Sequence, residues 1–211
     1  MEIEKETIQA GTPIPTPIRS PKKTNVRMIV GMGLLTAIVV VLQMLASQIK
    51  FGPFSITLCL APIAVGAALY GRLSGAWLGF VFSMVVMFTD TALFMAINPM
   101  GTIITVILKG TLAGLAAGII YKPLSKKSDL LATLVSCVVV PLVNKLVFVG
   151  GCALFFYDTM VEWAAGAGAS NVVFYMFIGM TGLNFPVELA VNLILSAAIV
   201  RIVQMGRKQL V

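Results

Sequence analysis

The sequence contains no histidine, few charges and only three cysteines. Without histidine, the chain has neither imidazole metal ligands nor the usual side chain for proton transfer near neutral pH. Charged residues make up 11% of the chain, whereas soluble domains carry about 25%. Cys59, Cys137 and Cys152 stand apart in apolar surroundings without a C-x-x-C pair, so we interpret them as small packing residues. These absences exclude an ordinary soluble domain, a disordered chain and a nucleic-acid-binding domain.

Long apolar segments fill most of the chain instead. Hydrophobic side chains account for 59% of the 211 residues, and the mean hydropathy is +1.01. A membrane-spanning helix needs about 20 apolar residues, so this length allows about six spans. We therefore predict an all-α membrane protein that forms a six-transmembrane-helix bundle. The predicted spans are 27–49, 56–70, 74–92, 102–121, 130–156 and 183–204.

Two connections between these spans have features of their own. A tight turn is expected at 71–75, directly after the short second span, which contains Pro62. The segment 157–182 is a longer connection, and its part 172–180 is apolar enough for a short interfacial or re-entrant helix.

The distribution of basic residues predicts how the spans are oriented. If both termini are cytoplasmic, the inner segments hold nearly all of the Lys and Arg residues, and the outer loops hold only Lys50. Cytoplasmic loops of membrane proteins carry such an excess, which favours this orientation. We expect a disordered cytoplasmic tail over 1–26, a six-helix membrane domain over 27–205 and a short cytoplasmic tail over 206–211.

Small residues recur at every fourth position in three of the spans. Such rows let helix backbones approach each other closely. In the third and fourth spans we interpret them as packing inside the bundle, whereas the row on the first span could instead face another protein. The rows are Gly75, Gly79 and Ser83; Gly110, Gly114 and Gly118; and Gly33 with Ala37.

Four ionisable residues lie in or at the ends of spans: Asp90, Lys109, Lys145 and Glu188. Charges within a membrane are costly and usually face a cavity or a partner. Under the predicted topology all four fall in the outer half of the membrane, together with nearby Asn and Thr side chains that share helix faces with them. The candidate binding residues are Asp90, Asn98, Thr105, Lys109, Asn144, Lys145, Asn184, Glu188 and Asn192.

This polar layer has three interpretations. It could form an outward-opening pocket for a ligand with a carboxylate or zwitterionic group. It could be a structural Lys–Glu pair that fixes helix packing, with a surplus lysine reaching toward the membrane surface. A proton relay would need a continuous path inward, and the inner half of the spans carries no carboxylate to supply one.

Motifs for enzymatic chemistry are missing from the sequence. No Walker motif or other phosphate-binding glycine loop is present, so the chain cannot hydrolyse ATP by itself. Ser136 and Lys145 share the fifth span, but they lie about 13 Å apart along a helix, too far for direct proton transfer. We therefore expect no enzyme activity, no metal site and no cofactor.

Two local patterns add a resemblance to a known family. Residues 67–75, AALYGRLSG, and 109–118, KGTLAGLAAG, resemble the turn between helices two and three and the fourth helix of the substrate-binding S components of energy-coupling factor (ECF) vitamin transporters. Where this chain has Arg72, the family's turn often has proline. The resemblance covers about residues 27–205 and implies that this region is a substrate-binding domain.

The resemblance also implies partners and a location. S components capture a vitamin-like ligand from outside and dock on a transmembrane coupling protein that works with two ABC ATPases, which use the ATP. The family's docking motif, Ala-x-x-x-Ala, corresponds here to Gly33 and Ala37. The expected location is a bacterial-type plasma membrane, in contact with lipid and without nucleic acid.

The sequence leaves more than one ligand to consider. Two lysines favour a carboxylate-bearing vitamin such as pantothenate. Riboflavin is also possible because Phe51, Phe54, Phe94 and Trp163 are available for stacking, although these rings could equally be interfacial anchors. A membrane scaffold without a ligand and a stand-alone secondary transporter are the rival functions, but the inverted repeats typical of the latter are not evident.

Overall fold

The computed structural model describes residues 26–51, 54–55, 57, 59–180, 182, 185–191, 193–194, 201 and 205. Its elements are helical apart from one antiparallel hairpin of two short strands. Residues 185–191 are also helical. The elements are α1 (Val26–Ala46), β1 (Lys50–Phe51), β2 (Phe54–Ser55), α2 (Leu60–Tyr70), α3 (Arg72–Thr89), α4 (Ala92–Ile97), α5 (Pro99–Leu124), α6 (Asp129–Phe155), α7 (Tyr157–Gly166), α8 (Val172–Phe174) and the π-helix η1 (Tyr175–Gly179).

Within the described residues, four helices, α1, α3, α5 and α6, are long and apolar enough to cross a membrane. They confirm the spans predicted at 27–49, 74–92, 102–121 and 130–156. The second predicted span is shorter than expected, because α2 has 11 residues and extends only about 16 Å. The sixth predicted span, 183–204, and both predicted tails lie largely or wholly outside the described residues.

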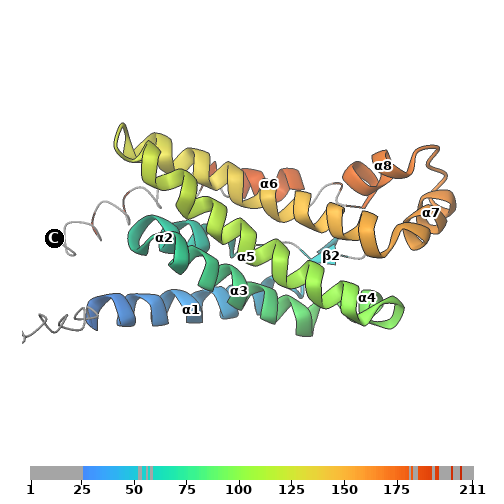
Figure 1. Ribbon diagram of the computed structural model, residues 1–211, viewed down its shortest axis with the longest axis horizontal. Coiled ribbons are helices and arrows are strands. Elements are labelled where there is room, and N and C mark those ends of the chain that lie inside the picture. The colour runs from blue at the N-terminus through green and yellow to red at the C-terminus, as the bar shows by residue number, and fades with distance from the viewer. Residues whose placement is uncertain are drawn as a thin grey trace, which may run out of the picture.

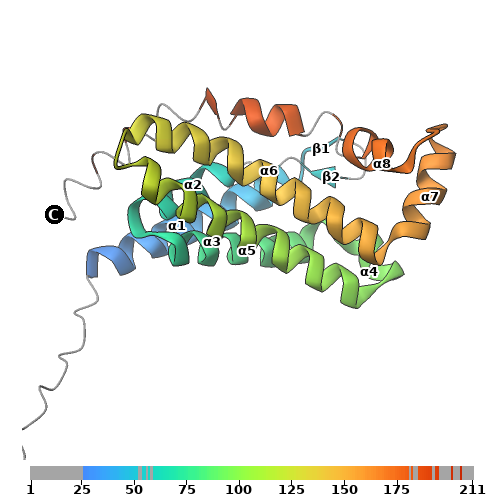
Figure 2. The ribbon, with the colours of Figure 1, turned by 45° about the horizontal axis from the view of Figure 1, so that its top comes forward.

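The long helices run side by side, and the bundle has two distinct ends (Figures 1 and 2). One end carries the hairpin, α4 and the start of α7, and we call it the hairpin end. The other carries the α2–α3 turn and the α5–α6 turn with Lys122, Lys126 and Lys127, and we call it the lysine end. The two ends therefore differ sharply in charge.

Glycines set the distance between α3 and α5. A Cβ atom on Gly79 would overlap the carbonyl oxygen of Gly110, and a Cβ on Gly75 would overlap that of Gly114. The two backbones are thus in direct contact, which confirms the predicted role of these rows in packing. By contrast, a Cβ on Gly33 would meet nothing within 4 Å.

The core lies where α2, α3 and α5 meet, and large buried side chains such as Ile63, Leu78 and Phe82 fill it. Pro62 is the third residue of α2, in the first turn, where the helix needs no backbone N–H donor. The proline is therefore tolerated there and does not interrupt the helix. Gly71 alone joins α2 to α3, and its positive φ of 93° is a conformation that favours glycine. The turn predicted at 71–75 is therefore a single residue.

The hairpin end contains elements that the sequence did not indicate. The hairpin, α4 and α7 were not predicted, whereas α8 and η1 confirm the short helix expected within 172–180. Asn98 caps α5 by accepting a 2.9 Å hydrogen bond from the Gly101 N–H, and Pro99 follows at the first helical position. Together, α4 and this cap place the start of α5 against the end of α3.

Candidate functional site

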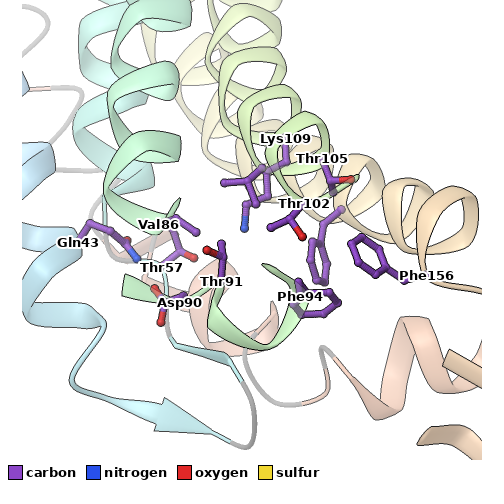
Figure 3. A pocket seen from close by; sticks show the side chains of 12 residues that line it. Gln43, Thr57, Val86, Asp90, Thr91, Phe94, Thr102, Thr105, Lys109 and Phe156 are labelled. Carbon is purple, nitrogen blue, oxygen red and sulfur yellow. The ribbon is translucent and has the colours of Figure 1, made fainter. Parts of the chain in front are cut away.

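A small cavity lined by both polar and apolar side chains lies at the hairpin end, between α1, α3, α4, α5 and α6 (Figure 3). Its walls combine one lysine, one aspartate, one glutamine, several threonines and several phenylalanines. It encloses about 60 Å³, less than the 300–1,000 Å³ typical of ligand pockets. The lining residues are Gln43, Thr57, Val86, Asp90, Thr91, Phe94, Thr102, Thr105, Val106, Lys109, Phe148 and Phe156.

Lys109 projects into this cavity from α5. Its Nζ lies 5.1 Å from the ring centre of Phe148 and 5.8 Å from that of Phe82. Glu188 and Asp90 interact with it electrostatically, but no carboxylate in the described part of the chain forms an ion pair with it. The ammonium group is therefore held by aromatic faces and by charges at longer range.

The predicted polar face of α5 lines the cavity. Thr102 and Thr105 are buried and lie two turns and one turn before Lys109, respectively. The Thr102 hydroxyl donates to the Asn98 carbonyl oxygen at 2.8 Å. The Thr105 hydroxyl has no hydrogen-bond partner among the described residues. Its oxygen lies against Gly151 of α6, where a Cβ atom would overlap it, so this buried hydroxyl leaves its hydrogen-bonding capacity unused.

Asp90 brings a carboxylate to the other side of the cavity. It follows the last residue of α3, and its Oδ2 accepts a 2.8 Å hydrogen bond from the Thr89 hydroxyl. Its Oδ1 is buried and finds no hydrogen-bond donor within the described residues. The structure thus brings three predicted site residues, Asp90, Thr105 and Lys109, to one cavity.

Glu188 lies just behind the cavity wall. Its Oε1 accepts a 2.9 Å hydrogen bond from the backbone N–H of Thr57, and the side chain is buried. This bond joins the helical residues 185–191 to the segment between the hairpin and α2. Glu188 therefore contacts a lining residue without itself lining the cavity.

The remaining predicted residues do not line the cavity. The Lys145 ammonium group lies 4.4 Å from the ring centre of Phe185. Asn144 is buried, and its Oδ1 has no partner in the described ranges. Asn98 serves as the helix cap described above, and Asn184 and Asn192 lie outside the described residues.

Sequence reasoning missed Gln43, Thr57 and an aromatic wall. Gln43 is an uncharged polar residue within a long apolar span, a signal that could have pointed to it. Phe94 packs edge-to-face on Phe148, Phe156 and Trp163, with ring centres 5.1–5.9 Å apart. Phe94 and Trp163, two rings considered for stacking on riboflavin, therefore pack in one cluster.

Gly33 and Ala37 lie far from the cavity, on the exposed face of α1. The same face carries exposed Val30, Leu34 and Val41. This small-residue row is apolar, and at Gly33 it contacts none of the other helices that the structure describes, unlike the rows in α3 and α5.

These features define a multi-pass membrane protein with a candidate small-molecule site at one end of its bundle. The family model for the "ECF transporter, substrate-specific component" matches residues 27–200. The chain therefore belongs to this family, whose members are substrate-binding transport subunits rather than enzymes. A comparison with curated proteins finds no match.

Proposed function

We propose that the cavity binds a carboxylate-bearing vitamin, with pantothenate the favoured ligand, for import by an ECF transporter. The observation that carries this proposal is the position of Lys109. Its ammonium group faces the cavity beside Thr102 and Thr105, and no described residue forms an ion pair with it. A ligand carboxylate placed there would gain a charge-assisted hydrogen bond from the Lys109 ammonium group.

The dimensions of the cavity require it to open when the ligand enters. A volume of about 60 Å³ suits a few water molecules rather than a vitamin. The walls formed by α4 and by the segment around Thr57 consist of short elements, whereas α3 and α5 are fixed by backbone contact. Ligand binding would therefore displace the short elements and leave the long helices in place.

The proposed orientation places the cavity toward the outside. Lys122, Lys126 and Lys127 gather at the opposite end, and a cytoplasmic location of that end agrees with the usual excess of basic residues inside. Both termini would then be cytoplasmic, in a bacterial-type plasma membrane. The exposed row at Gly33 and Ala37 would contact the transmembrane coupling protein, which acts with two ATPases.

The first test is to identify what the chain binds. The protein is purified alone in mild detergent, and any small molecule that it retains is identified by mass spectrometry. Binding of pantothenate to the emptied protein is then measured by calorimetry. A retained or titrating carboxylate vitamin supports the proposal. A folded protein that binds no vitamin would favour a scaffold role, and a retained neutral vitamin would reject the carboxylate.

A further inference from the structure

Gln43 combines deep burial with an unused hydrogen-bonding group. It lies in the last turn of α1, and its side chain is 1% exposed to solvent. Its Oε1 lies 3.5 Å from the Cys59 sulfur, which donates to it. Its amide nitrogen lines the cavity and makes no hydrogen bond within the described ranges. Because the carbonyl oxygen of the Gln43 amide accepts the Cys59 bond, the NH₂ group of the same amide faces the cavity.

Asp90 offers the complementary group. Its unpaired Oδ1 is an acceptor, whereas the Gln43 amide nitrogen is a donor. Both side chains lie on the same side of the cavity, and the Phe94 and Phe156 rings lie on the other, with Lys109 between them (Figure 3). Buried polar groups in native proteins nearly always have partners. A donor and an acceptor that line one cavity and lack partners among the described residues therefore indicate a place for a bound polar group.

We propose that Gln43 and Asp90 form a second polar subsite that recognises a ligand group able both to accept and to donate a hydrogen bond, such as an amide or a hydroxyl. This inference rests on the proposed function, since it assigns part of the same cavity to the ligand. It narrows the substrate class to molecules with an anionic group near Lys109 and an amide or hydroxyl near α1. It also makes α1 a ligand-contacting helix, although Gly33 and Ala37 on that helix face outward.

The variants Gln43→Leu and Asp90→Leu test this subsite, with Gln48→Leu as the matched control. Gln48 is exposed and lies outside the cavity. Pantothenate, which carries an amide and hydroxyls, is titrated into each protein, and octanoate, which carries only the carboxylate, is titrated in parallel. We expect each subsite variant to weaken pantothenate binding by about tenfold or more, because a buried hydrogen bond is lost. Octanoate binding should not change.

A second measurement does not depend on the ligand. The melting temperature of each protein is recorded after mass spectrometry shows that no small molecule remains bound. Gln43 accepts one weak bond from Cys59 and Asp90 one local bond from Thr89, and their other polar atoms have no partner among the described residues. Apolar groups of similar shape should therefore leave the melting temperature close to that of the wild type. If Gln43 and Asp90 had a structural role, both variants would melt several degrees lower.

The two measurements separate failure of this inference from failure of the proposed function. Unchanged pantothenate affinity in Gln43→Leu, or a clear loss of stability in the empty variants, would overturn the subsite. Wild-type protein that is folded but binds no pantothenate would reject pantothenate as the ligand. In that case the melting temperatures of the empty variants decide whether the subsite stands. Melting temperatures close to or above that of the wild type support the subsite.

Discussion

The backbone N–H of Thr57 donates a 2.9 Å hydrogen bond to Oε1 of Glu188, a residue 131 positions later in the chain. Both partners are buried. The bond ties the segment after the hairpin to the helical residues 185–191, and Thr57 itself lines the cavity. A carboxylate inside a membrane domain is therefore bound to backbone and holds one wall of the candidate site.

Removing this acceptor should destabilise the protein. Glu188→Ala leaves the buried Thr57 N–H without its partner, which should lower the free energy of unfolding by about 1–3 kcal/mol. Glu188→Gln retains a side-chain oxygen that can accept the same bond, so its effect should be clearly smaller. Thermal unfolding in detergent compares the two variants, with Glu162→Ala on exposed α7 as the control. Equal destabilisation by Ala and Gln would mean that the charge of Glu188, rather than this bond, matters.

Lys109 should contribute strongly to binding of an anionic ligand. Lys109→Met keeps the length of the side chain and its apolar contact with Phe82 and Phe148 but removes the positive charge. We expect pantothenate affinity to fall by roughly 10- to 100-fold, because a hydrogen bond to a charged group contributes about 1.5–3 kcal/mol. Calorimetric titration measures the change.

The control for this prediction is Lys122→Met, which removes a lysine at the opposite end of the bundle. It should leave pantothenate affinity unchanged. If both variants bind pantothenate as tightly as the wild type, the carboxylate lies elsewhere, and Lys145 becomes the next candidate.

The sequence predicted the long helices better than the site. Continuous apolar runs determine α1, α3, α5 and α6, whereas the six residues of α4 are too few to show a helical period. Three predicted polar residues meet in the cavity because Asp90, Thr105 and Lys109 lie on two helices in backbone contact. The rotation of α6 is set by tertiary packing, so the sequence could not show that Lys145 lies over Phe185 rather than in the cavity. The dipeptide Asn98–Pro99 is a helix-start signal, which explains why Asn98 caps α5.

Adding a methyl group at the α3–α5 contact should destabilise the bundle. In Gly79→Ala the new Cβ would overlap the carbonyl oxygen of Gly110, so the two backbones must separate. Overpacking of this kind costs about 1–3 kcal/mol. Gly33→Ala is the matched control, because its Cβ points into open space. The melting temperature should fall for Gly79→Ala and stay level or rise for Gly33→Ala, since alanine favours helices. Similar melting temperatures for both would show that α3 and α5 can move apart freely.

The exposed row on α1 makes a prediction about the coupling protein. Gly33→Trp and Ala37→Trp place a large ring on an exposed face, so folding and pantothenate binding should be retained. Close helix contact needs small residues, so co-purification with the coupling protein should be lost. Gly31→Trp serves as a control for a packed position on the same helix. Gly31 packs against the Tyr70 hydroxyl, so a large ring there should disrupt folding of the bundle. Folded Gly33→Trp protein that still co-purifies with its partner would place the docking surface on another helix. Loss of folding in Gly33→Trp would instead show that this face of α1 is covered within the protein.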